Sequence, residues 1–220
     1  MTERARIDGI FTGTVQDRWP TKPPSAIAKA RRDGPVSLGA TGFLGDAQAD
    51  LAVHGGRGKA VHVYPVAHYA RWRRDLGDRA AFAPGGFGEN VAVAGWTEAD
   101  VCIGDVMAMG TARVAISQGR QPCWKLTAHV GEDSMAYRMR KTRRTGWYLR
   151  VLEGGAVAEG DDLVLLERPN DGWTVHRVAT ALFDLKADPG DVDALAGMAD
   201  LDPSWRGVFA ERRSEREAVR

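Results

Sequence analysis

The chain has 220 residues, of which 44% are hydrophobic and 27% are charged. A chain of this length buries roughly 70% of its unfolded surface, so it supports a core without disulfides, and its composition excludes wholesale disorder. Lys and Arg number 30 against 29 Asp and Glu, a net charge of +1. Nothing global therefore points to a nucleic acid or an anionic membrane as a partner.

No apolar run approaches the ~18 residues of a membrane span. The N-terminal residues 1–6 are charged and lead into no apolar signal-peptide stretch. We therefore expect a cytoplasmic protein with no membrane partner. The two cysteines, Cys102 and Cys123, fit a reducing compartment and cannot by themselves form a Cys-rich metal site.

The first half of the chain is β-rich. Short apolar segments separated by glycine and proline predict strands at 6–16, 36–38, 60–64, 88–94 and 106–116. One helix interrupts them, with Pro65 as its first position and Gly77 as its stop. Many short strands of this kind favour a barrel or a sandwich over a βαβ repeat.

Two helices at 122–129 and 131–144 and two strands at 147–152 and 162–167 follow. The second helix carries a basic cluster, which is either a phosphate site or, as such runs usually are, a solvated face. The cluster consists of Arg138, Arg140, Lys141, Arg143 and Arg144.

The turn at 170–172 predicts a boundary, because the apolar period is helical beyond it. We expect a β-rich domain over 1–170 and an extension of three helices over 171–220. The first helix covers 175–183, the second covers 191–199 with Asp191 as its cap, and the third covers 204–220 with Ser204 as its N-cap and Trp205 as an anchor.

Cys123 lies in the segment SQGRQPCWKL, residues 117–126, after a strand pattern and a proline. It should therefore open a helix, whose free N–H groups and dipole favour a thiolate, as do the nearby Arg120 and Lys125. Such a thiolate is a nucleophile, a redox sulfur or a soft metal ligand, and the alternative is a buried core cysteine. Cys102 has apolar neighbours and is expected to be structural.

Two glycine-rich segments are further candidates. His54, Arg57 and Lys59 alternate with glycines in HGGRGK, residues 54–59, which suits an anionic ligand or a tight turn. Glu89 and Asn90 follow glycines at 85–88, where they are either partners for the edge of a heterocycle or part of a turn.

The remaining histidines, His62, His68, His129 and His176, form no metal-binding spacing, although His129 falls near Cys123. One cysteine and scattered histidines do not form a zinc site, which argues against zinc hydrolysis, and no dinucleotide fingerprint is present. A Cys–His hydrolase using Cys123 and His54 stays open.

Taken together, the segments closely resemble MOSC-domain proteins of the YiiM type, related to the C-terminal domain of molybdenum cofactor sulfurases. The resemblance runs over about residues 5–170, and the helical tail is similar to the three-helix extension of those proteins. The matching motifs, in order, are His54-Gly55-Gly56, KAVHVYP at 59–65, FGEN at 87–90, IGDV at 103–106, RQPCWKL at 120–126 and TGWY at 145–148.

The resemblance implies a mainly β fold with some helix: a MOSC β-barrel, similar to the barrel domain of pyruvate kinase, plus a small C-terminal extension. It implies the molybdenum cofactor (Mo-molybdopterin), with Cys123 as a ligand of the metal. It also implies reduction of small N-hydroxylated compounds, including hydroxylaminopurine base analogues, with electrons from a flavoprotein or other reductase. Some relatives join a pyridoxal phosphate domain, for which this chain has no room.

Within this hypothesis Cys123 and His54 are the catalytic residues. The cofactor would be held by His54, Lys59, Glu89, Asn90, Arg120 and Lys125. Two alternatives are a carrier that binds the cofactor or its sulfur without turnover and a cofactor-free thiol enzyme. The chain departs from the family pattern at Arg57 and Gly58, where Pro and Asp are usual, and at Gly119, where Pro is usual. The oligomeric state is left open.

Overall fold

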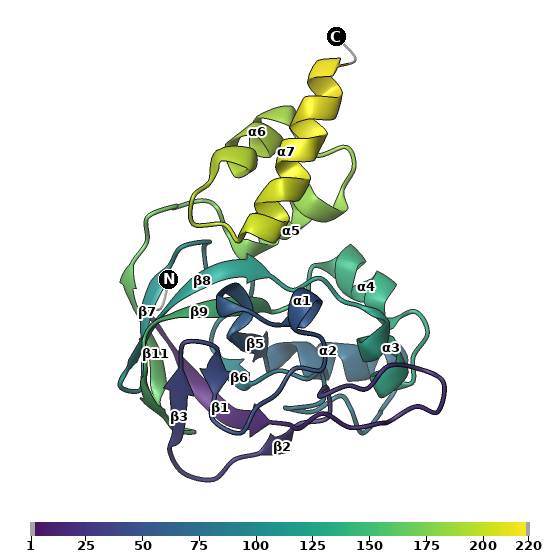
Figure 1. Ribbon diagram of the computed structural model, residues 1–220, viewed down its shortest axis with the longest axis vertical. Coiled ribbons are helices and arrows are strands. Elements are labelled where there is room, and N and C mark those ends of the chain that lie inside the picture. The colour runs from purple at the N-terminus through teal and green to yellow at the C-terminus, as the bar shows by residue number, and fades with distance from the viewer. Residues whose placement is uncertain (1–2, 219–220) are drawn as a thin grey trace.

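The computed structural model describes residues 3–218, with the side chain of Val53 excepted. Its centre is a closed barrel of seven strands, because β1 pairs with β6 on one side and with β11 on the other (Figure 1). Around the barrel the order is β1, β11, β7, β8, β9, β5, β6. The bounds are β1 (Arg4–Thr12), β5 (Val61–Pro65), β6 (Val91–Ala94), β7 (Val106–Met109), β8 (Ala112–Gly119), β9 (Trp147–Glu153) and β11 (Asp162–Glu167).

One strand pair of the barrel is parallel. β5 runs beside β6 in the same direction, and every other neighbouring pair is antiparallel. Parallel neighbours need a crossover connection, which here contains helix α2 (Ala67–Leu76). The predicted stop at Gly77 is its C-cap, whereas Pro65 ends β5 instead of opening the helix.

The predicted strand over 6–16 is too long at its C-terminal end. β1 ends at Thr12, since the N–H of Gly13 donates to the carboxylate of Asp46 at 2.8 Å instead of continuing the ladder. β2 (Ala30–Arg31) adds to β1, and a separate small sheet contains β3 (Val36–Gly39), β4 (Gly42–Phe43) and β10 (Gly155–Val157).

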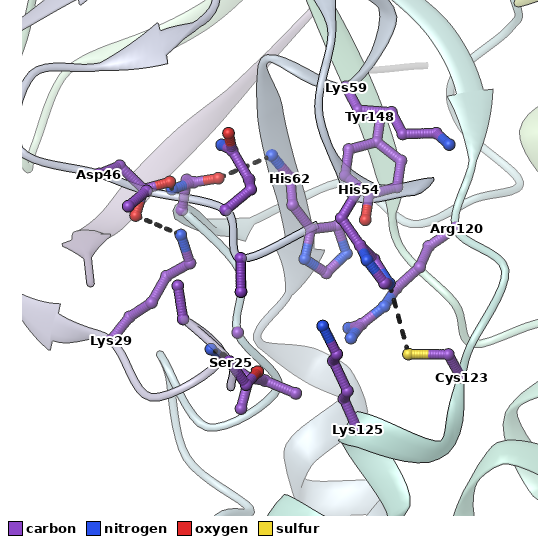
Figure 2. A pocket seen from close by; sticks show the side chains of 17 residues that line it. Ser25, Lys29, Asp46, His54, Lys59, His62, Arg120, Cys123, Lys125 and Tyr148 are labelled. Atoms are coloured by element: carbon purple, nitrogen blue, oxygen red, sulfur yellow. Dashed lines mark hydrogen bonds and ion pairs between the residues drawn. The ribbon is translucent and has the colours of Figure 1, made fainter. Parts of the chain in front are cut away.

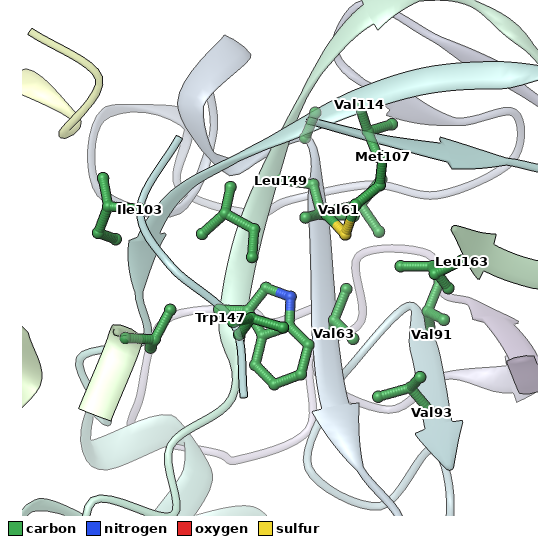
Figure 3. Close-up of a cluster of buried hydrophobic side chains, with 14 of the residues drawn as sticks. Val61, Val63, Val91, Val93, Ile103, Met107, Val114, Trp147, Leu149 and Leu163 are labelled. Atoms are coloured by element: carbon green, nitrogen blue, oxygen red, sulfur yellow. The ribbon is translucent and has the colours of Figure 1, made fainter. Parts of the chain in front are cut away.

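The barrel interior is filled by apolar side chains from all around the sheet (Figure 3). Trp147 lies among them and is fully buried. Successive side chains on a strand point to opposite faces, so Val61 and Val63 of β5 enter this core while His62 between them points outward. Each such apolar side chain contributes roughly 1.5–3 kcal/mol on burial.

Three helices cover the outside of β5. A second apolar cluster, which includes Tyr64, Trp72 and Phe87, packs α2 together with α3 (Trp124–Val130) and α4 (Met135–Thr142). From these helices Leu126 and Met139 enter the cluster. The cluster fixes the position of α3, whose N-cap is Cys123. The predicted helices over 122–129 and 131–144 are thus present in shorter form.

Helices α5 (Val175–Phe183), α6 (Pro189–Gly197) and α7 (Pro203–Ala218) follow the barrel and lie at one end of it (Figure 1). Two predicted caps are wrong. Asp188, not Asp191, caps α6, accepting from the N–H groups of Gly190 and Asp191. Ser204 is inside α7, and its N–H donates to Asp202 at 2.9 Å. Both helices begin with a proline, and in both an aspartate directly precedes this proline, at the N-cap position.

Barrel and extension share one continuous apolar cluster, which reaches from the barrel interior to Val178, Leu182, Trp205 and Phe209 of the extension. The division at residue 170 therefore stays a prediction, although the change from strands to helices occurs beyond β11 as expected. Across residues 3–218 no helix is long and apolar enough to cross a membrane.

A buried carboxylate joins two strands of the barrel at their ends. Asp105 is fully buried, accepts from the N–H of Cys102 at 2.8 Å and receives both Nε and Nη2 of Arg168, at 2.9 and 2.7 Å. Arg168 follows β11 directly, so this two-pronged pair ties the end of β11 to the start of β7.

We predict that Asp105→Ala lowers the free energy of unfolding by about 3 kcal/mol, because it strips the partner from a largely buried guanidinium and an amide. Urea unfolding measures the loss. Glu159→Ala is the matched control, since it removes a carboxylate from the solvent-exposed pair with Arg31 and should change stability far less. Equal losses in the two variants would contradict the structural role of Asp105.

Candidate functional site

An open cavity lies on the outer face of the barrel wall, over β5 and β9 (Figure 2). His62 of β5 and Tyr148 of β9, which pair across the two strands, form its floor. The neighbours of these two residues along each strand point the other way, into the core. The lining residues are Ser25, Ala26, Ile27, Lys29, Asp46, Ala47, Gln48, Ala49, His54, Lys59, His62, Gly88, Asn90, Arg120, Cys123, Lys125 and Tyr148.

Cys123 lies in this cavity at the start of α3, as predicted. Its segment follows β8 and is fixed from two sides. The N–H of Arg120 donates to the carbonyl of Gly146 at 3.1 Å, and Nη2 of Arg140 donates to the carbonyl of Pro122 at 3.1 Å. These backbone contacts set where the sulfur points.

The Cys123 thiol is acidic. Its Sγ lies 3.6 Å from Nε2 of His54, which is within hydrogen-bond reach of sulfur (Figure 2). Partial burial alone would raise the pKa of the thiol, but the hydrogen bond from His54, the positive charge of Arg120 and the N–H of Lys125 together lower that pKa to about 7. The reactive thiolate form of Cys123 is therefore available near neutral pH.

Positive side chains line the cavity that holds the sulfur. Arg120 and Lys125 line the cavity although each is more than nine-tenths buried, and Lys59 lines it as well. Lys29 is a further buried cation, and it is paired with the carboxylate of Asp46. Burial lowers the pKa of Lys29, while Asp46 acts in the opposite direction. Arg120, Lys125 and Lys59 thus concentrate positive charge around a site that suits an anion.

Arg120 is aimed by a neighbouring turn. Its Nη1 donates to the carbonyl of Phe87 at 2.7 Å. The turn itself is held by Glu89, whose carboxylate accepts from the N–H groups of Gly85 and Phe87, at 2.6 and 3.0 Å, and from the hydroxyl of Tyr69. Burial raises the pKa of the Glu89 carboxyl despite these donors.

Glu89, which the sequence placed among the cofactor-binding residues, does not line the cavity. Its side chain is fully buried, and its carboxylate oxygens accept hydrogen bonds from the turn instead of facing the cavity. It supports the site through Phe87 and Arg120 instead. Asn90 does line the cavity, but its amide is committed: Nδ2 donates to Asp46 at 2.8 Å, and Oδ1 accepts from the N–H of His62 at 3.1 Å.

Glycine at position 88 is needed for this wall. Gly88 has φ of +74°, in the left-handed region, and a Cβ there would lie 2.7 Å from the side chain of Ile27. The loop that contains Ile27 lines the cavity next to Gly88. Any side chain at position 88 would strain the backbone and push this loop away.

His62 and Tyr148 are functional candidates that the sequence did not reveal as such. Burial, together with the charge of Arg120, holds the pKa of His62 well below its usual value, so its ring is neutral. Burial raises the pKa of Tyr148. The signal was available in the alternation of Val61, His62 and Val63, which places a polar ring outside a barrel strand.

Lys29, Asp46 and Ser25 also line the cavity. They come from loops far from every motif, so no local pattern pointed to them.

Other candidates lie outside the cavity. Cys102 is buried, and burial raises the pKa of its thiol, as expected for a structural cysteine. His129 is at the far end of α3 and does not line the cavity. None of the five residues of the predicted basic cluster lines the cavity. Arg144, which follows α4, pairs with Asp75 at 2.8 Å and stacks over Trp72, while Arg140 of α4 holds the carbonyl of Pro122.

Comparisons with known proteins assign the chain to a family. The model of the MOSC domain matches residues 50–164. Protein YiiM of Escherichia coli is 36% identical over 205 residues, covering 93% of this chain and 91% of that protein. A protein of Gibberella moniliformis named reductase is 39% identical over 156 residues, covering 70% of this chain and 28% of that protein.

The fold agrees with solved relatives. The crystal structure of YiiM from Geobacillus stearothermophilus superposes with a TM-score of 0.82 at 30% identity, covering 95% of this chain and 99% of that one. The chain therefore belongs to the MOSC-domain family and has the barrel and C-terminal helices of YiiM structures. The MOSC domain is associated with the molybdenum cofactor.

We predict that iodoacetamide alkylates Cys123 with a midpoint near pH 7 and that His54→Ala moves this midpoint upward, toward the ordinary thiol value of about 8.5. The sign follows from the hydrogen bond, which stabilises the thiolate over the thiol. Mass spectrometry of the Cys123 peptide measures the rate. A Cys102→Ser background removes the second thiol, and His129→Ala is the control for loss of a distant imidazole. An unchanged midpoint in His54→Ala would refute the contact.

Proposed function

We propose that this protein is a molybdenum-cofactor-dependent oxidoreductase that reduces N-hydroxylated compounds. One observation carries the proposal: an acidic cysteine stands in a cavity whose wall includes Lys59, Arg120 and Lys125. A thiolate is the soft anionic ligand that a metal of this kind takes from a protein, and buried Arg and Lys suit a phosphate-bearing cofactor.

The residues fit such a cofactor. Lys125 is more than nine-tenths buried at the cavity wall, with the face of Trp124 5.9 Å from its Nζ. Nδ1 of His54 is buried without a hydrogen-bond partner among the described residues, so it has a free position toward a bound group. Cys123 would hold the metal, while Lys59, Arg120 and Lys125 would hold the anionic part. Asn90 holds the wall beside His62.

The reaction consumes two electrons and two protons, converting R–NH–OH into R–NH₂ and water. When bound, the cofactor supplies the two electrons by a change in oxidation state of its metal. We assign proton delivery to His54, whose Nε2 lies next to the sulfur. The neutral ring of His62 and the hydroxyl of Tyr148 line the floor and are placed to orient a polar substrate.

The electrons must reach the cofactor from outside, and we propose a flavoprotein or another reductase as the donor. The fungal relative named reductase supports this view, since the match spans only 28% of its length and it therefore contains a large additional part. Within the described residues no group of three or more His, Cys, Asp and Glu side chains is placed to hold a metal ion. A small N-hydroxylated molecule, such as a hydroxylaminopurine, is the substrate class.

We predict that the protein, expressed in a host that makes the cofactor, retains molybdenum and that Cys123→Ala loses it, because no other thiol reaches the cavity. Metal analysis measures the content per chain, and Cys102→Ser serves as the control that removes the other cysteine. Equal molybdenum in Cys123→Ala and the parent protein would rule out the ligand role. Molybdenum bound without reduction of hydroxylaminopurine by a reconstituted donor would indicate a carrier, and a metal-free reactive thiol would indicate a thiol enzyme.

We predict that Lys125→Met lowers cofactor affinity by roughly 10- to 150-fold, because a hydrogen bond to a charged group is worth about 1.5–3 kcal/mol. Methionine keeps the apolar stem that packs in the wall. Molybdenum retained after dialysis measures the loss. Lys141→Met, on the exposed surface of α4, is the control, and the same retention in both variants would contradict the assignment.

A further inference from the structure

The first turn of α7 lies directly behind two segments of the cavity. One is the short 3-10 helix η1 (Arg57–Lys59), which contains Gly58 and ends at the cavity-lining Lys59. The other is the end of β8, where Gly119 precedes Arg120. Neither glycine has a φ in the left-handed region, so the backbone conformation does not demand glycine at these two places.

At Gly58 the space of a side chain is taken by Asp202. A Cβ on Gly58 would lie 1.9 Å from Oδ2 of Asp202 and 3.1 Å from its Cγ. Contacts this short are not tolerated, so any other residue at position 58 must displace the carboxylate or the η1 segment. Asp202 is the residue that precedes α7.

Asp202 is fixed and does not yield easily. Its Oδ1 accepts from the N–H and the hydroxyl of Ser204, at 2.9 and 2.6 Å. Its own N–H donates to the carbonyl of Ser117 at 2.9 Å, and its carbonyl accepts from Trp205 and Arg206 at 3.1 and 3.0 Å. The carboxylate is thereby held against Gly58 by the helix start and by β8 together.

At Gly119 the space of a side chain is taken by Trp205. A Cβ there would lie 2.8 Å from the indole ring of Trp205, which is buried against the barrel. The contacts to the two glycines thus come from residues three positions apart, Asp202 just before α7 and Trp205 in its first turn. The hydroxyl of Ser117 adds a link between the segments, since it is bonded to the carbonyl of Gly58 and lies 3.1 Å from that of Tyr148.

We infer that the start of α7 positions the cavity: Asp202 and Trp205 set the spacing between the segment that carries His54 and Lys59 and the segment that carries Arg120 and Cys123. Asp202 and Trp205 touch neither the cavity nor the reacting atoms, so they are positioning residues. The C-terminal extension then contributes to the geometry of the site. The inference refers to the site of the proposed function but does not need bound cofactor for its test.

The test inserts one methyl group. Gly58→Ala should slow alkylation of Cys123 by iodoacetamide at pH 7 by at least about threefold in metal-free protein, because a shift of η1 carries His54 away from the sulfur. It should also lower the molybdenum content of protein from a cofactor-making host. Gly207→Ala places the same methyl group on α7 where nothing lies within 4 Å, and both readouts should equal those of the parent protein.

Rescue separates positioning from general destabilisation. Asp202→Ser keeps an N-cap oxygen but removes the carboxylate that meets the methyl group, so Gly58→Ala with Asp202→Ser should regain at least half of the lost alkylation rate. A folded Gly58→Ala with parental rate overturns the inference, as does a double variant that is slower than Gly58→Ala.

If Gly58→Ala does not fold, Asp202→Ser alone provides the test. It removes the carboxylate that packs against Gly58, so it should slow alkylation of Cys123. An alkylation rate equal to that of the parent protein would overturn the inference. Parent protein without molybdenum would defeat the proposed function, whereas the alkylation result in metal-free protein still stands by itself.

Discussion

The site depends on keeping a sulfur anion stable in a partly desolvated place. Burial raises the pKa of the Cys123 thiol. His54, Arg120 and the N–H of Lys125 all act on its sulfur and lower the pKa by more than burial raises it. His54 belongs to one segment, whereas Arg120 and the N–H of Lys125 belong to the segment that follows β8. That second segment is held by side-chain hydrogen bonds from Arg120 to Phe87 and from Arg140 to Pro122, and by the backbone hydrogen bond from Arg120 to Gly146. The barrel wall, the turn at Glu89 and the helical extension all serve to bring these segments to one place.

The wall between core and cavity is one strand thick. Because β-strands alternate their faces, β5 and β9 present Val63 and Trp147 to the core and His62 and Tyr148 to the cavity. The same strands therefore account for stability and for chemistry. This placement keeps His62 neutral, because burial of its ring and the positive charge of Arg120 both lower its pKa.

The sequence allowed prediction of the β-rich body, the helical tail and the place of Cys123 at a helix start, because apolar periodicity and proline signals are local. It did not allow prediction of the committed hydrogen bonds of Glu89, whose donors depend on tertiary packing. Lys29 and Asp46 lay outside every motif and meet only when the chain folds. Gly58 and Gly119, which stood as unexplained departures from a family pattern, have a steric reason in Asp202 and Trp205.

The closure of the barrel joins chain segments that are far apart: Arg4 to Arg6 pair with Asp162 to Val164. A nascent chain therefore leaves the edges of β1 and β7 without their partner strand β11 until about three-quarters of it has left the ribosome. Such long-range pairing slows folding, and an incomplete barrel offers an open strand to other chains. Truncation ahead of β11 would not yield a smaller barrel but an aggregation-prone open sheet.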